Sequence, residues 1–432
     1  MKRLLAIWLG KIINFISSMG KFGAGSTWPG HVSLKINPKI ISQLTSQLKK
    51  GTILIAGTNG KTTTVKLISQ ILKEENPDII INDSGANLLN GLASTLINKS
   101  DWLGKIKASW AVFETDEATL PLALAETEPK IVIILNLFRD QLDRYGEIDL
   151  IAEKWQQALK KLSLETTVIL NADDPHVAFL GKGLRNRVFY FGLNDKNLFL
   201  AKMEHAVDTV YCPSCNAKLD FEGVFFSHLG FWSCPGCRFS RPTPNLFVWD
   251  YPLSGTYNRY NTLAAVLAAK ILGVEDQKIN LSLQKFKPAF GRQEKINLNG
   301  KNVQILLAKN PAGFNECLRT LKDFPGQKKT VLLVLNDRIP DGQDVSWIWD
   351  VDFEIIKENV SSLLVSGDRA FDLDLRLKYA DFPLEKTEVK IDLKEALKKG
   401  LATIPPKETF YILPTYSAML EVRKILGGRK IL

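Results

Sequence analysis

Apolar runs alternate with amphipathic segments along much of the chain. Between residues 52 and 174 the runs "TILIAG", "ASWAVFET", "KIVIILN" and "TTVILNADD" are separated by stretches of helical spacing such as "ATLPLALAE" and "IDLIAEKWQQALKKL". Strands that are apolar on both faces are typical of a parallel sheet with helices on both sides. The pattern therefore predicts an α/β domain. In such domains ligands bind beyond the carboxyl ends of the strands.

A second alternation begins near residue 293, with "VQILLAK", "KTVLLVLND", "SSLLVSG" and "ETFYILPT" as its strands. It predicts a smaller C-terminal α/β domain over residues 293–432. The first domain is expected over residues 45–292, preceded by an N-terminal helix and a linker over residues 1–44. Within the first domain, residues 205–243 change to a composition rich in Cys, Phe and Gly, which indicates an insert.

Composition and charge narrow the function classes only slightly. The 432 residues are 45% hydrophobic and carry a formal net charge of +10. A positive balance fits an acidic ligand, a nucleic acid or an anionic membrane surface. The positive residues are scattered, however, so we interpret most of them as a solvated surface.

The first segment, "MKRLLAIWLGKIINFISS", has a basic start and an apolar stretch that Lys11 and Asn14 interrupt. No small-residue cleavage site follows, and the chain has no uninterrupted apolar run long enough to span a bilayer. We therefore expect a cytoplasmic protein with an amphipathic N-terminal helix. The helix either packs on the body of the protein or rests at the inner face of the membrane, with Trp8 and Phe15 on its apolar side.

The stretch "ILIAGTNGKTTTVKLISQIL" resembles a phosphate-binding loop. An apolar strand ends at Gly57, a polar loop follows, and helical spacing begins near Thr62. Backbone N–H groups and the positive end of a helix dipole converge on an anion in such a turn. Lys61 is expected to reach the outer phosphates of ATP and Thr62 to bind Mg²⁺. The predicted nucleotide loop comprises Gly57, Thr58, Asn59, Gly60, Lys61, Thr62 and Thr63, although Ile55 replaces the first glycine of the longer P-loop pattern.

Four of the five cysteines form two C-x-x-C pairs separated by eighteen residues, namely Cys212, Cys215, Cys234 and Cys237. This spacing is typical of a structural Zn²⁺ ribbon, in which four thiolates close a tetrahedral site. Two redox pairs are the alternative. His205 and His228 are interpreted as incidental, and Cys317 as an inert core thiol. Zinc ribbons also occur in proteins that bind nucleic acid, but the surroundings are not rich in arginine, so no nucleic-acid partner is expected.

Taken together, these motifs resemble the Mur ligase family, whose members use ATP to activate a carboxylate as an acyl phosphate and pass it to an amine. "AGTNGKTTT" resembles the P-loop of that family, and "VFETDE" resembles its acidic strand end, where Glu114 would hold Mg²⁺. "LSGTYNRYNTLAAVLAA" places Asn258 and Asn261 near the nucleotide, and "FGRQE" supplies Arg292 for a phosphate. "NLFRDQLDRYGEID" and "VILNADDP" resemble two further family motifs. The resemblance thus implies Lys61 and Glu114 as catalytic residues.

Several acidic residues near these motifs have two interpretations. Asp116 and Glu117 either serve the metal site or form a solvated cluster at the end of a strand. Asp173 and Asp174 either belong to the nucleotide site or cap a turn.

The chain also departs from the family pattern. Gln141 stands where the ligases usually have a metal-binding histidine, and Lys154 lies near the position of their carbamylated lysine without a fixed register. The P-loop comes too early for the domain that binds uridine nucleotides. "LAKNPAGFNE" replaces the usual Asp-Tyr-Ala-His.

These departures and the zinc ribbon resemble one branch, the MurT-type subunit of lipid II isoglutaminyl synthase. The resemblance implies amidation of the D-glutamate α-carboxylate in the lipid II stem peptide. It also implies a heterodimer in which a GatD-type glutamine amidotransferase subunit supplies ammonia. An acid from this chain would complete the glutaminase site, and "SWIWDVDFE" suggests Asp350, with Asp344 and Asp352 as alternatives. The rival hypotheses are an amino-acid-adding ligase of the Mur or folylpolyglutamate type and a zinc-ribbon NTPase that binds nucleic acid.

Overall fold

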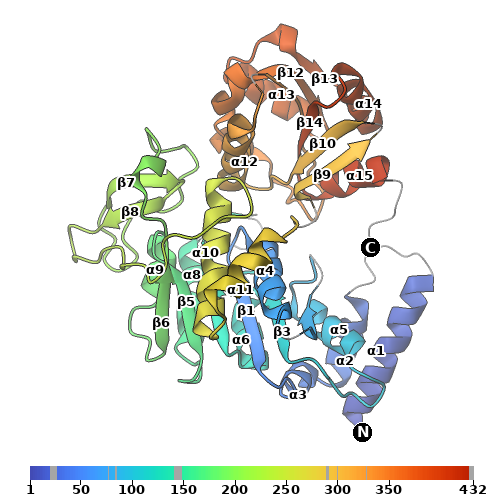
Figure 1. Ribbon diagram of the computed structural model, residues 1–432, viewed down its shortest axis with the longest axis vertical. Coiled ribbons are helices and arrows are strands. Elements are labelled where there is room, and N and C mark those ends of the chain that lie inside the picture. Colours follow the sequence, from blue (N-terminus) through green and yellow to red (C-terminus); the bar gives the residue numbers. More distant parts are fainter. Residues whose placement is uncertain are drawn as a thin grey trace.

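The computed structural model describes residues 1–19, 27–75, 77–82, 85–140, 148–288, 291–298, 300–326 and 328–427. Figure 1 shows a central domain with a group of N-terminal helices at one side, a small β-ribbon at the other and a second domain above. The predicted α/β architecture with two sheet domains is confirmed.

A six-stranded parallel sheet forms the central domain, in the order β2-β3-β1-β4-β5-β6. Its strands are β1 (Gly51–Ala56), β2 (Ile79–Ile81), β3 (Trp110–Glu114), β4 (Ile131–Ile134), β5 (Thr167–Asn171) and β6 (Arg187–Phe191). Because β1 lies between β3 and β4, the loop that follows β1 faces the carboxyl ends of both neighbours.

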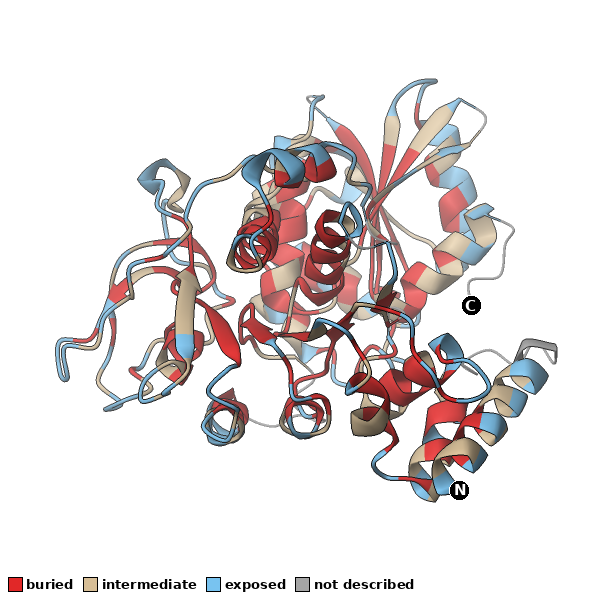
Figure 2. Ribbon diagram, turned by 60° about the horizontal axis from the view of Figure 1, so that its bottom comes forward, coloured by how far each residue is buried: buried red, intermediate tan, exposed pale blue. Residues whose placement is uncertain are grey.

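Helices cover both faces of this sheet, as the apolar runs predicted. Leu54 and Ala56 point to one face and Ile53 and Ile55 to the other, and all four are fully buried. The second face packs against α4 (Lys61–Lys73), α10 (Thr256–Ile271) and α11 (Asp276–Gln284). The first packs against α3 (Ile40–Thr45), α5 (Leu89–Lys99), α6 (Leu120–Thr127), α8 (Ile148–Leu159) and α9 (Pro175–Leu180). Figure 2 shows the buried residues of these layers on either side of the sheet.

The N-terminal segment contains three helices, whereas the sequence predicted one helix and a linker. α1 (Lys2–Met19) is followed by α2 (Trp28–Ile36) and then by α3. α1 packs on the body of the protein through the fully buried Ala6 and Ile7, and the Ser33 hydroxyl donates to the Ala6 carbonyl at 2.8 Å. Pro29 stands in the first turn of α2, a position that suits its fixed φ. Among the described residues, no helix is long and apolar enough to cross a membrane.

The insert forms a ribbon whose hairpin consists of β7 (Asp220–Phe226) and β8 (Leu229–Ser233), preceded by the short helix η1 (Lys196–Leu198). Phe225 and Phe226 belong to the same buried cluster as Tyr260 of α10. The ribbon is therefore fixed on the central domain by an aromatic cluster as well as by its own fold.

The C-terminal domain has a second six-stranded sheet, in the order β13-β12-β11-β14-β10-β9, in which only the β9–β10 pair is antiparallel. Its strands are β9 (Arg292–Leu298), β10 (Lys301–Leu306), β11 (Lys329–Val334), β12 (Val360–Ser366), β13 (Thr387–Val389) and β14 (Thr409–Pro414). Its helices are α12 (Pro311–Asp323), η2 (Ser346–Asp350), η3 (Phe353–Asn359), α13 (Ala370–Tyr379), η4 (Leu384–Lys386), α14 (Leu393–Thr403) and α15 (Tyr416–Gly427).

Candidate active site and metal centre

The loop between β1 and α4 has the geometry of a phosphate-binding turn. Gly57 and Gly60 adopt φ values of 136° and 91°, which favour glycine. A Cβ atom on Gly60 would lie 2.0 Å from the Asn261 side-chain oxygen, so that position also has no room for a larger residue. The Asn136 side chain fixes the turn by accepting from the Asn59 N–H at 2.8 Å and donating to the Asn59 carbonyl at 3.0 Å.

Thr62 and Glu114 meet at the carboxyl ends of neighbouring strands. The Thr62 hydroxyl, in the first turn of α4, donates to the Glu114 carboxylate at 2.5 Å. Glu114 is the last residue of β3, and Asn82 holds its backbone by accepting from the N–H at 3.0 Å and donating to the carbonyl at 2.9 Å. A hydroxyl and a carboxylate side by side are oxygen ligands of the kind Mg²⁺ prefers. The predicted pair is thus brought together, and its donor set fits Mg²⁺.

Lys61 belongs to a buried group of alternating charges. Its ammonium donates to the Gly57 carbonyl at 2.5 Å and lies 3.4 Å from the Glu117 carboxylate. Burial opposes ionisation of Glu117, but attraction from Lys61 and from Lys309 outweighs it, so the pKa of the Glu117 carboxyl lies below its usual value. Lys309 in turn forms an ion pair with Asp140. Glu117 therefore holds the ammonium of Lys61, the predicted catalytic lysine.

Lys309 comes from the C-terminal domain, in the loop between β10 and α12. Burial lowers the pKa of its ammonium, but the Asp140 and Glu117 carboxylates more than compensate and raise it. The next residue, Asn310, caps α12 by accepting from the Gly313 N–H at 2.9 Å and exchanges two side-chain hydrogen bonds with Asn59. In the sequence this stretch stands out only as a departure from the family pattern. An Asn-Pro pair after a buried strand, which is typical of a helix start, could have marked it.

A pocket between the two domains brings the remaining predicted nucleotide residues together. It is lined by Asn59, Gly60, Thr63, Asn261 and Arg292, with Phe226 of the ribbon at its side. Asn258 lies next to the pocket, and its side-chain oxygen accepts from the Asn261 amide at 3.2 Å. The Thr58 hydroxyl is directed elsewhere and donates to the Phe138 carbonyl at 3.2 Å. The arrangement suits a polyphosphate ligand, because α4 points its N-terminus into the same space.

Asp173 and Asp174 have structural partners. The Asp173 carboxylate accepts from Arg241 at 2.6 Å and from the Tyr260 hydroxyl at 2.6 Å, and it thereby ties the ribbon to α10. The Asp174 carboxylate accepts from the Val177 N–H at 3.1 Å and caps α9. For Asp174 the capping interpretation is therefore correct. Asp173 anchors the ribbon, a role that the sequence analysis did not anticipate.

Lys154 and Gln141 are the two positions at which the sequence departs from the metal-binding pattern of the Mur ligases. Lys154 is exposed on α8 and lines a groove with α6, so it does not contact Lys61 or Glu114. Gln141 lies outside the described residues.

Three aspartates near η2 were candidates for a role in a partner's site, and their surroundings differ. Asp344 accepts from the Ser346 N–H at 2.8 Å, and this bond lowers the pKa of the Asp344 carboxyl. Asp352 accepts from the Asn315 side chain at 3.1 Å and also pairs with His205. Asp350 is 39% exposed and accepts from Arg139 at 3.1 Å. Asp344 and Asp350 both line the cleft that also contains Arg139 and Lys309, and of these two aspartates Asp350 is the one that forms an ion pair with the central domain.

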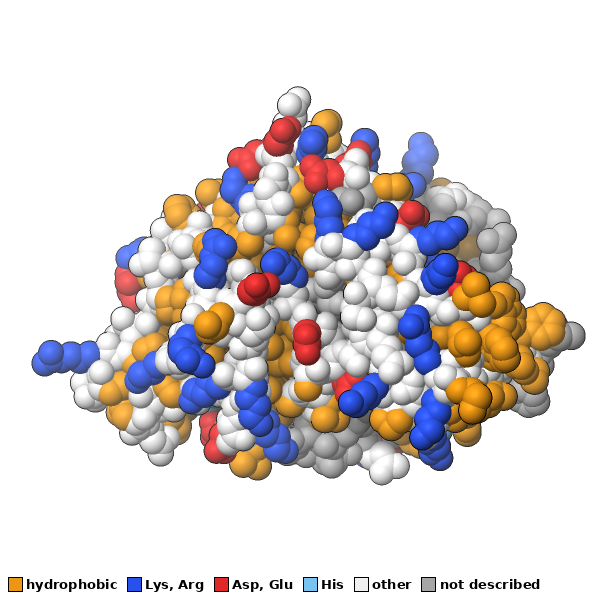
Figure 3. Space-filling model, turned by 90° about the horizontal axis from the view of Figure 1, so that it is seen from below, with side chains coloured by type: hydrophobic (Ala, Val, Ile, Leu, Met, Phe, Trp, Pro, Cys, Tyr) orange, Lys and Arg blue, Asp and Glu red, His pale blue; other side chains and the backbone are white. Residues whose placement is uncertain are grey.

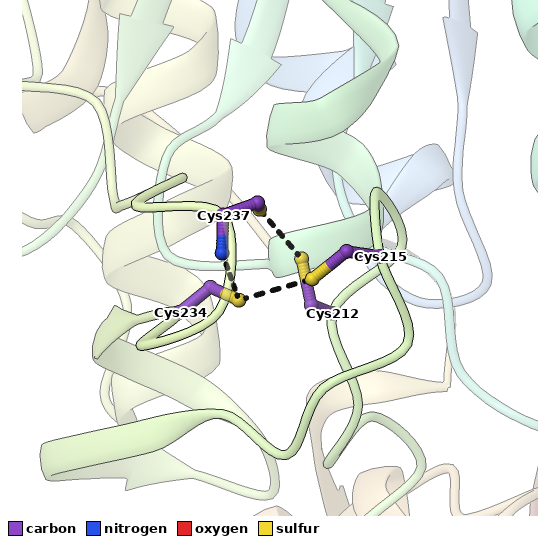
Figure 4. Close-up of side chains that lie close together, drawn as sticks. All are labelled: Cys212, Cys215, Cys234 and Cys237. Carbon is purple, nitrogen blue, oxygen red and sulfur yellow. Dashed lines mark hydrogen bonds between the residues drawn. The ribbon is translucent and has the colours of Figure 1, made fainter.

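The four paired cysteines of the ribbon converge on one point (Figure 4). Their sulfurs all lie within 4.8 Å of one another, with 3.6 Å between Cys212 and Cys237 and 3.4 Å between Cys215 and Cys234. Tetrahedral Zn–S bonds of about 2.3 Å place sulfurs roughly 3.8 Å apart, so the cluster fits Zn²⁺ closely. Neither His205 nor His228 belongs to the cluster.

The two cysteine pairs sit in equivalent turns. The residue after each pair, Asn216 and Arg238, has a left-handed backbone, with φ of 60° and 61°. Each of these residues donates its N–H to the carbonyl of the first cysteine of its pair, at 2.8 and 3.0 Å. A backbone hydrogen bond involving Phe239 is the main reason why the pKa of the Cys237 thiol falls to about 6, whereas burial raises the pKa of Cys212 to about 12. Two such turns facing each other are what four-sulfur coordination requires.

Comparisons with known proteins agree with this geometry. The sequence model of the Mur ligase middle domain matches residues 55–269, and that of the MurT ligase C-terminal domain matches residues 307–419. The MurT subunit of lipid II isoglutaminyl synthase (glutamine-hydrolyzing) from Streptococcus pneumoniae is 34% identical, over 100% of this chain and 98% of the relative. The subunit of the same name from Staphylococcus aureus strain COL is 33% identical, over 99% and 98%.

Solved structures share the fold. A pseudomurein peptide ligase type C from Methanothermus fervidus superimposes with a TM-score of 0.65 and 24% identity, over 89% of this chain and 80% of that one. The MurF ligase from Thermotoga maritima, solved in complex with ADP, gives a TM-score of 0.62 and 15% identity, over 91% and 83%.

Proposed function

This chain belongs to the MurT branch of the Mur ligase family, and we propose that it activates the α-carboxylate of D-glutamate in the lipid II stem peptide with ATP, for amidation by ammonia. Membership of the family makes the chain an ATP-dependent ligase of peptidoglycan synthesis. The observation that carries the proposed chemistry is the contact between Thr62 and Glu114 beside Lys61, at the carboxyl ends of β1 and β3.

In the first step a carboxylate oxygen of the substrate attacks the γ-phosphorus of ATP, the bond from that phosphorus to the β,γ-bridging oxygen breaks, and ADP leaves. Negative charge collects on the transferred phosphoryl group. Lys61 stabilises this charge, and Glu117 keeps the ammonium in place. Mg²⁺, when bound, would be held by Thr62 and Glu114 and would neutralise phosphate charge. The N–H groups of residues 57–63 and Arg292 would bind the phosphates.

In the second step the lone pair of ammonia attacks the acyl carbon, the nitrogen loses a proton, and inorganic phosphate leaves. The product is the primary amide, D-isoglutamine. Lys309 and Asn310 occupy the stretch where the family usually carries residues for an incoming amino acid. This replacement supports a small acceptor such as ammonia, because no longer amine has to be positioned.

We further propose that the ammonia comes from a glutaminase subunit of GatD type, to which this chain contributes Asp350. Such an enzyme needs an acid that orients and stabilises the catalytic imidazole. Asp350 is flanked by Trp349, which is 45% exposed and packs edge-on against Tyr379 at 5.3 Å. Exposed aromatic side chains beside a partly exposed acid are suited to the core of an interface.

The metal of the cysteine cluster is proposed to be zinc, with a structural role. Four thiolates leave no position open for water or substrate. The cluster lies at the end of the ribbon that packs beside α9, whereas the hairpin turn at the other end contributes Phe226 to the pocket between the domains. The metal thus stabilises the ribbon, and the ribbon in turn supports the proposed nucleotide site through Phe226.

The proposal is tested by incubating the purified chain with ATP, Mg²⁺, ammonium and a short-chain lipid II analogue. Phosphate release and the mass of the peptide are then followed together. We expect one carboxyl group to become an amide for each phosphate released. An analogue whose α-carboxylate is already amidated is the matched control and should release no phosphate. Phosphate release coupled to the addition of an amino acid would instead identify an amino-acid-adding ligase.

A further inference from the structure

Helix α1 carries a second apolar face that points away from the protein. Ala6, Ile7 and Gly10 form the buried face. The opposite face consists of exposed residues at helical spacing, each between 45% and 64% accessible: Leu5, Trp8, Ile12, Phe15 and Ile16. A surface helix normally has a polar outer face. An exposed face made of five large apolar side chains therefore needs an explanation.

Neighbouring segments enlarge this face into one surface. Trp28, Trp102 and Leu103 are each about 60% exposed (60%, 58% and 63%). The Trp8 ring N–H donates to the Trp102 carbonyl at 2.8 Å, and the Lys11 ammonium lies 5.7 Å from the centre of the Trp102 ring. Figure 3 shows the hydrophobic side chains gathered at this edge of the molecule, bordered by lysines and arginines. We call this the N-terminal apolar surface.

The charge around this surface is predominantly positive. Residues 1–50 contain eight lysines and arginines and no aspartate or glutamate. Lys2, Lys35, Lys39 and Lys99 are exposed on α1, α2, the α2–α3 turn and the end of α5. Among the described residues of α1, α2 and the loop after α5, the one acidic side chain is Asp101. The positive charge beside the apolar residues therefore exceeds the single negative charge of Asp101.

We propose that the N-terminal apolar surface binds the surface of a lipid bilayer that contains anionic headgroups. Apolar side chains with tryptophan enter the boundary between headgroups and acyl chains, and lysines attract anionic lipids. α1 would lie in the plane of the interface and would not span it, in agreement with its length and its interrupting polar residues. A second copy of this chain fits less well, because a twofold contact would bring the same positive charges together.

The surface is connected to the active site through α5. Gly30 of α2 packs so closely on α5 that a Cβ atom would lie 1.9 Å from the Asn90 carbonyl oxygen. The loop that leads into α5 reaches the metal site, where the Gly85 N–H lies 3.5 Å from the Glu114 carboxylate. Bilayer binding at α1 would therefore hold the catalytic cleft at a fixed position relative to the lipid surface. The binding itself requires no ATP and does not depend on the proposed reaction.

The test uses the full-length chain and sedimentation with vesicles of phosphatidylglycerol and phosphatidylcholine, compared with vesicles of phosphatidylcholine alone. We expect binding to the anionic vesicles that weakens as salt is raised. Ile12→Glu/Ile16→Glu should weaken it by at least about tenfold, since each charge near an anionic surface changes binding by roughly fivefold. The matched control, Leu384→Glu/Ile391→Glu, replaces two apolar residues of the C-terminal domain that are somewhat more exposed than Ile12 and Ile16, and it should bind as the wild type does.

Melting temperature and phosphate release with the short-chain analogue are measured on the same variants, so that a folding defect or a wrong assignment of the reaction is recognised separately. The proposal is overturned if the wild type does not sediment with anionic vesicles, or if it binds neutral vesicles equally well. It is also overturned if the Ile12/Ile16 variant binds like the control. Finally, a wild-type dimer that this variant dissociates, with no vesicle binding, would assign the surface to a second copy.

Discussion

Asn59 and Asn310 exchange a pair of side-chain hydrogen bonds across the interface between the two domains, each 3.1 Å long. Asn59 belongs to the phosphate-binding loop, and Asn310 is the residue that caps α12. If nucleotide binding shifts this loop, the hydrogen bonds would carry the shift to the N-terminus of α12 in the other domain. The contact links the nucleotide site to the position of the C-terminal domain.

Replacing Asn310 should affect both the helix and the nucleotide site. Asn310→Ala removes the cap and should lower the free energy of unfolding by about 1 kcal/mol. It should also raise the KM for ATP, because Asn59 loses its partner. Asn310→Ser can still cap the helix but cannot reach Asn59, so we expect it to restore stability without restoring the KM. Thermal unfolding and ATP titration of the two variants check this. Equal KM values in Asn310→Ser and the wild type would contradict the proposed coupling.

Lys61→Ala should reduce ATP-dependent phosphate release by at least about a hundredfold, because the transferred phosphoryl group loses its nearest positive charge. The pKa of the Glu117 carboxyl should rise in this variant, since one of the two cations that lower it is gone. Lys73→Ala, at the exposed end of the same helix, serves as the control and should have full activity. Unchanged turnover of Lys61→Ala at saturating ATP would disprove the assignment of the loop.

The cysteine cluster should hold one zinc ion per chain in elemental analysis of the purified protein. Cys237→Ser should lose this metal, whereas Cys317→Ser, a buried thiol whose Sγ donates to the Leu307 carbonyl, should keep it. Because the aromatic cluster around Phe225 also fixes the ribbon, metal loss should raise hydrogen exchange in the two cysteine turns more than in β7 and β8. A wild-type protein without zinc, or uniform exchange over the whole ribbon, would refute this description.

Asp350→Asn should lower glutamine hydrolysis by the assembled complex, by up to about 10⁴-fold if the acid acts as in other catalytic triads. Amidation from free ammonium should persist, because the ATP chemistry lies in the cleft around Lys61. Asp344→Asn tests the alternative acid in the same cleft, and it should hydrolyse glutamine as the wild type does if Asp350 has the role. Glutamine hydrolysis at the wild-type rate by a complex that forms normally would remove Asp350 from the mechanism.

Local patterns in the sequence were sufficient to predict both sheet domains, the phosphate-binding turn and the cysteine cluster. The alternation of apolar runs and helical spacing predicted both sheet domains, because the period of hydrophobic residues reflects the geometry of each element. The positions of Gly57 and Gly60 predicted the phosphate-binding turn, since their backbone conformations suit glycine. The spacing of the four cysteines predicted the cluster, because each pair lies within one short turn. In each case the residues that matter are neighbours along the chain.

Contacts between distant segments were decided by the tertiary structure alone. Lys61 meets Glu117 over 56 residues, Lys309 meets Asp140 over 169, and Arg139 meets Asp350 over 211. The local spacing of hydrophobic and polar residues does not indicate such a pairing, because the pairing depends on how the two sheets and the ribbon pack together. The same holds for Asp173, for which the sequence left open a nucleotide site or a turn cap and which instead anchors the ribbon through Arg241 and Tyr260. Packing places Glu117 beside Lys61 and Lys309 beside Asp140, and these contacts lower the pKa of the Glu117 carboxyl and raise that of the Lys309 ammonium.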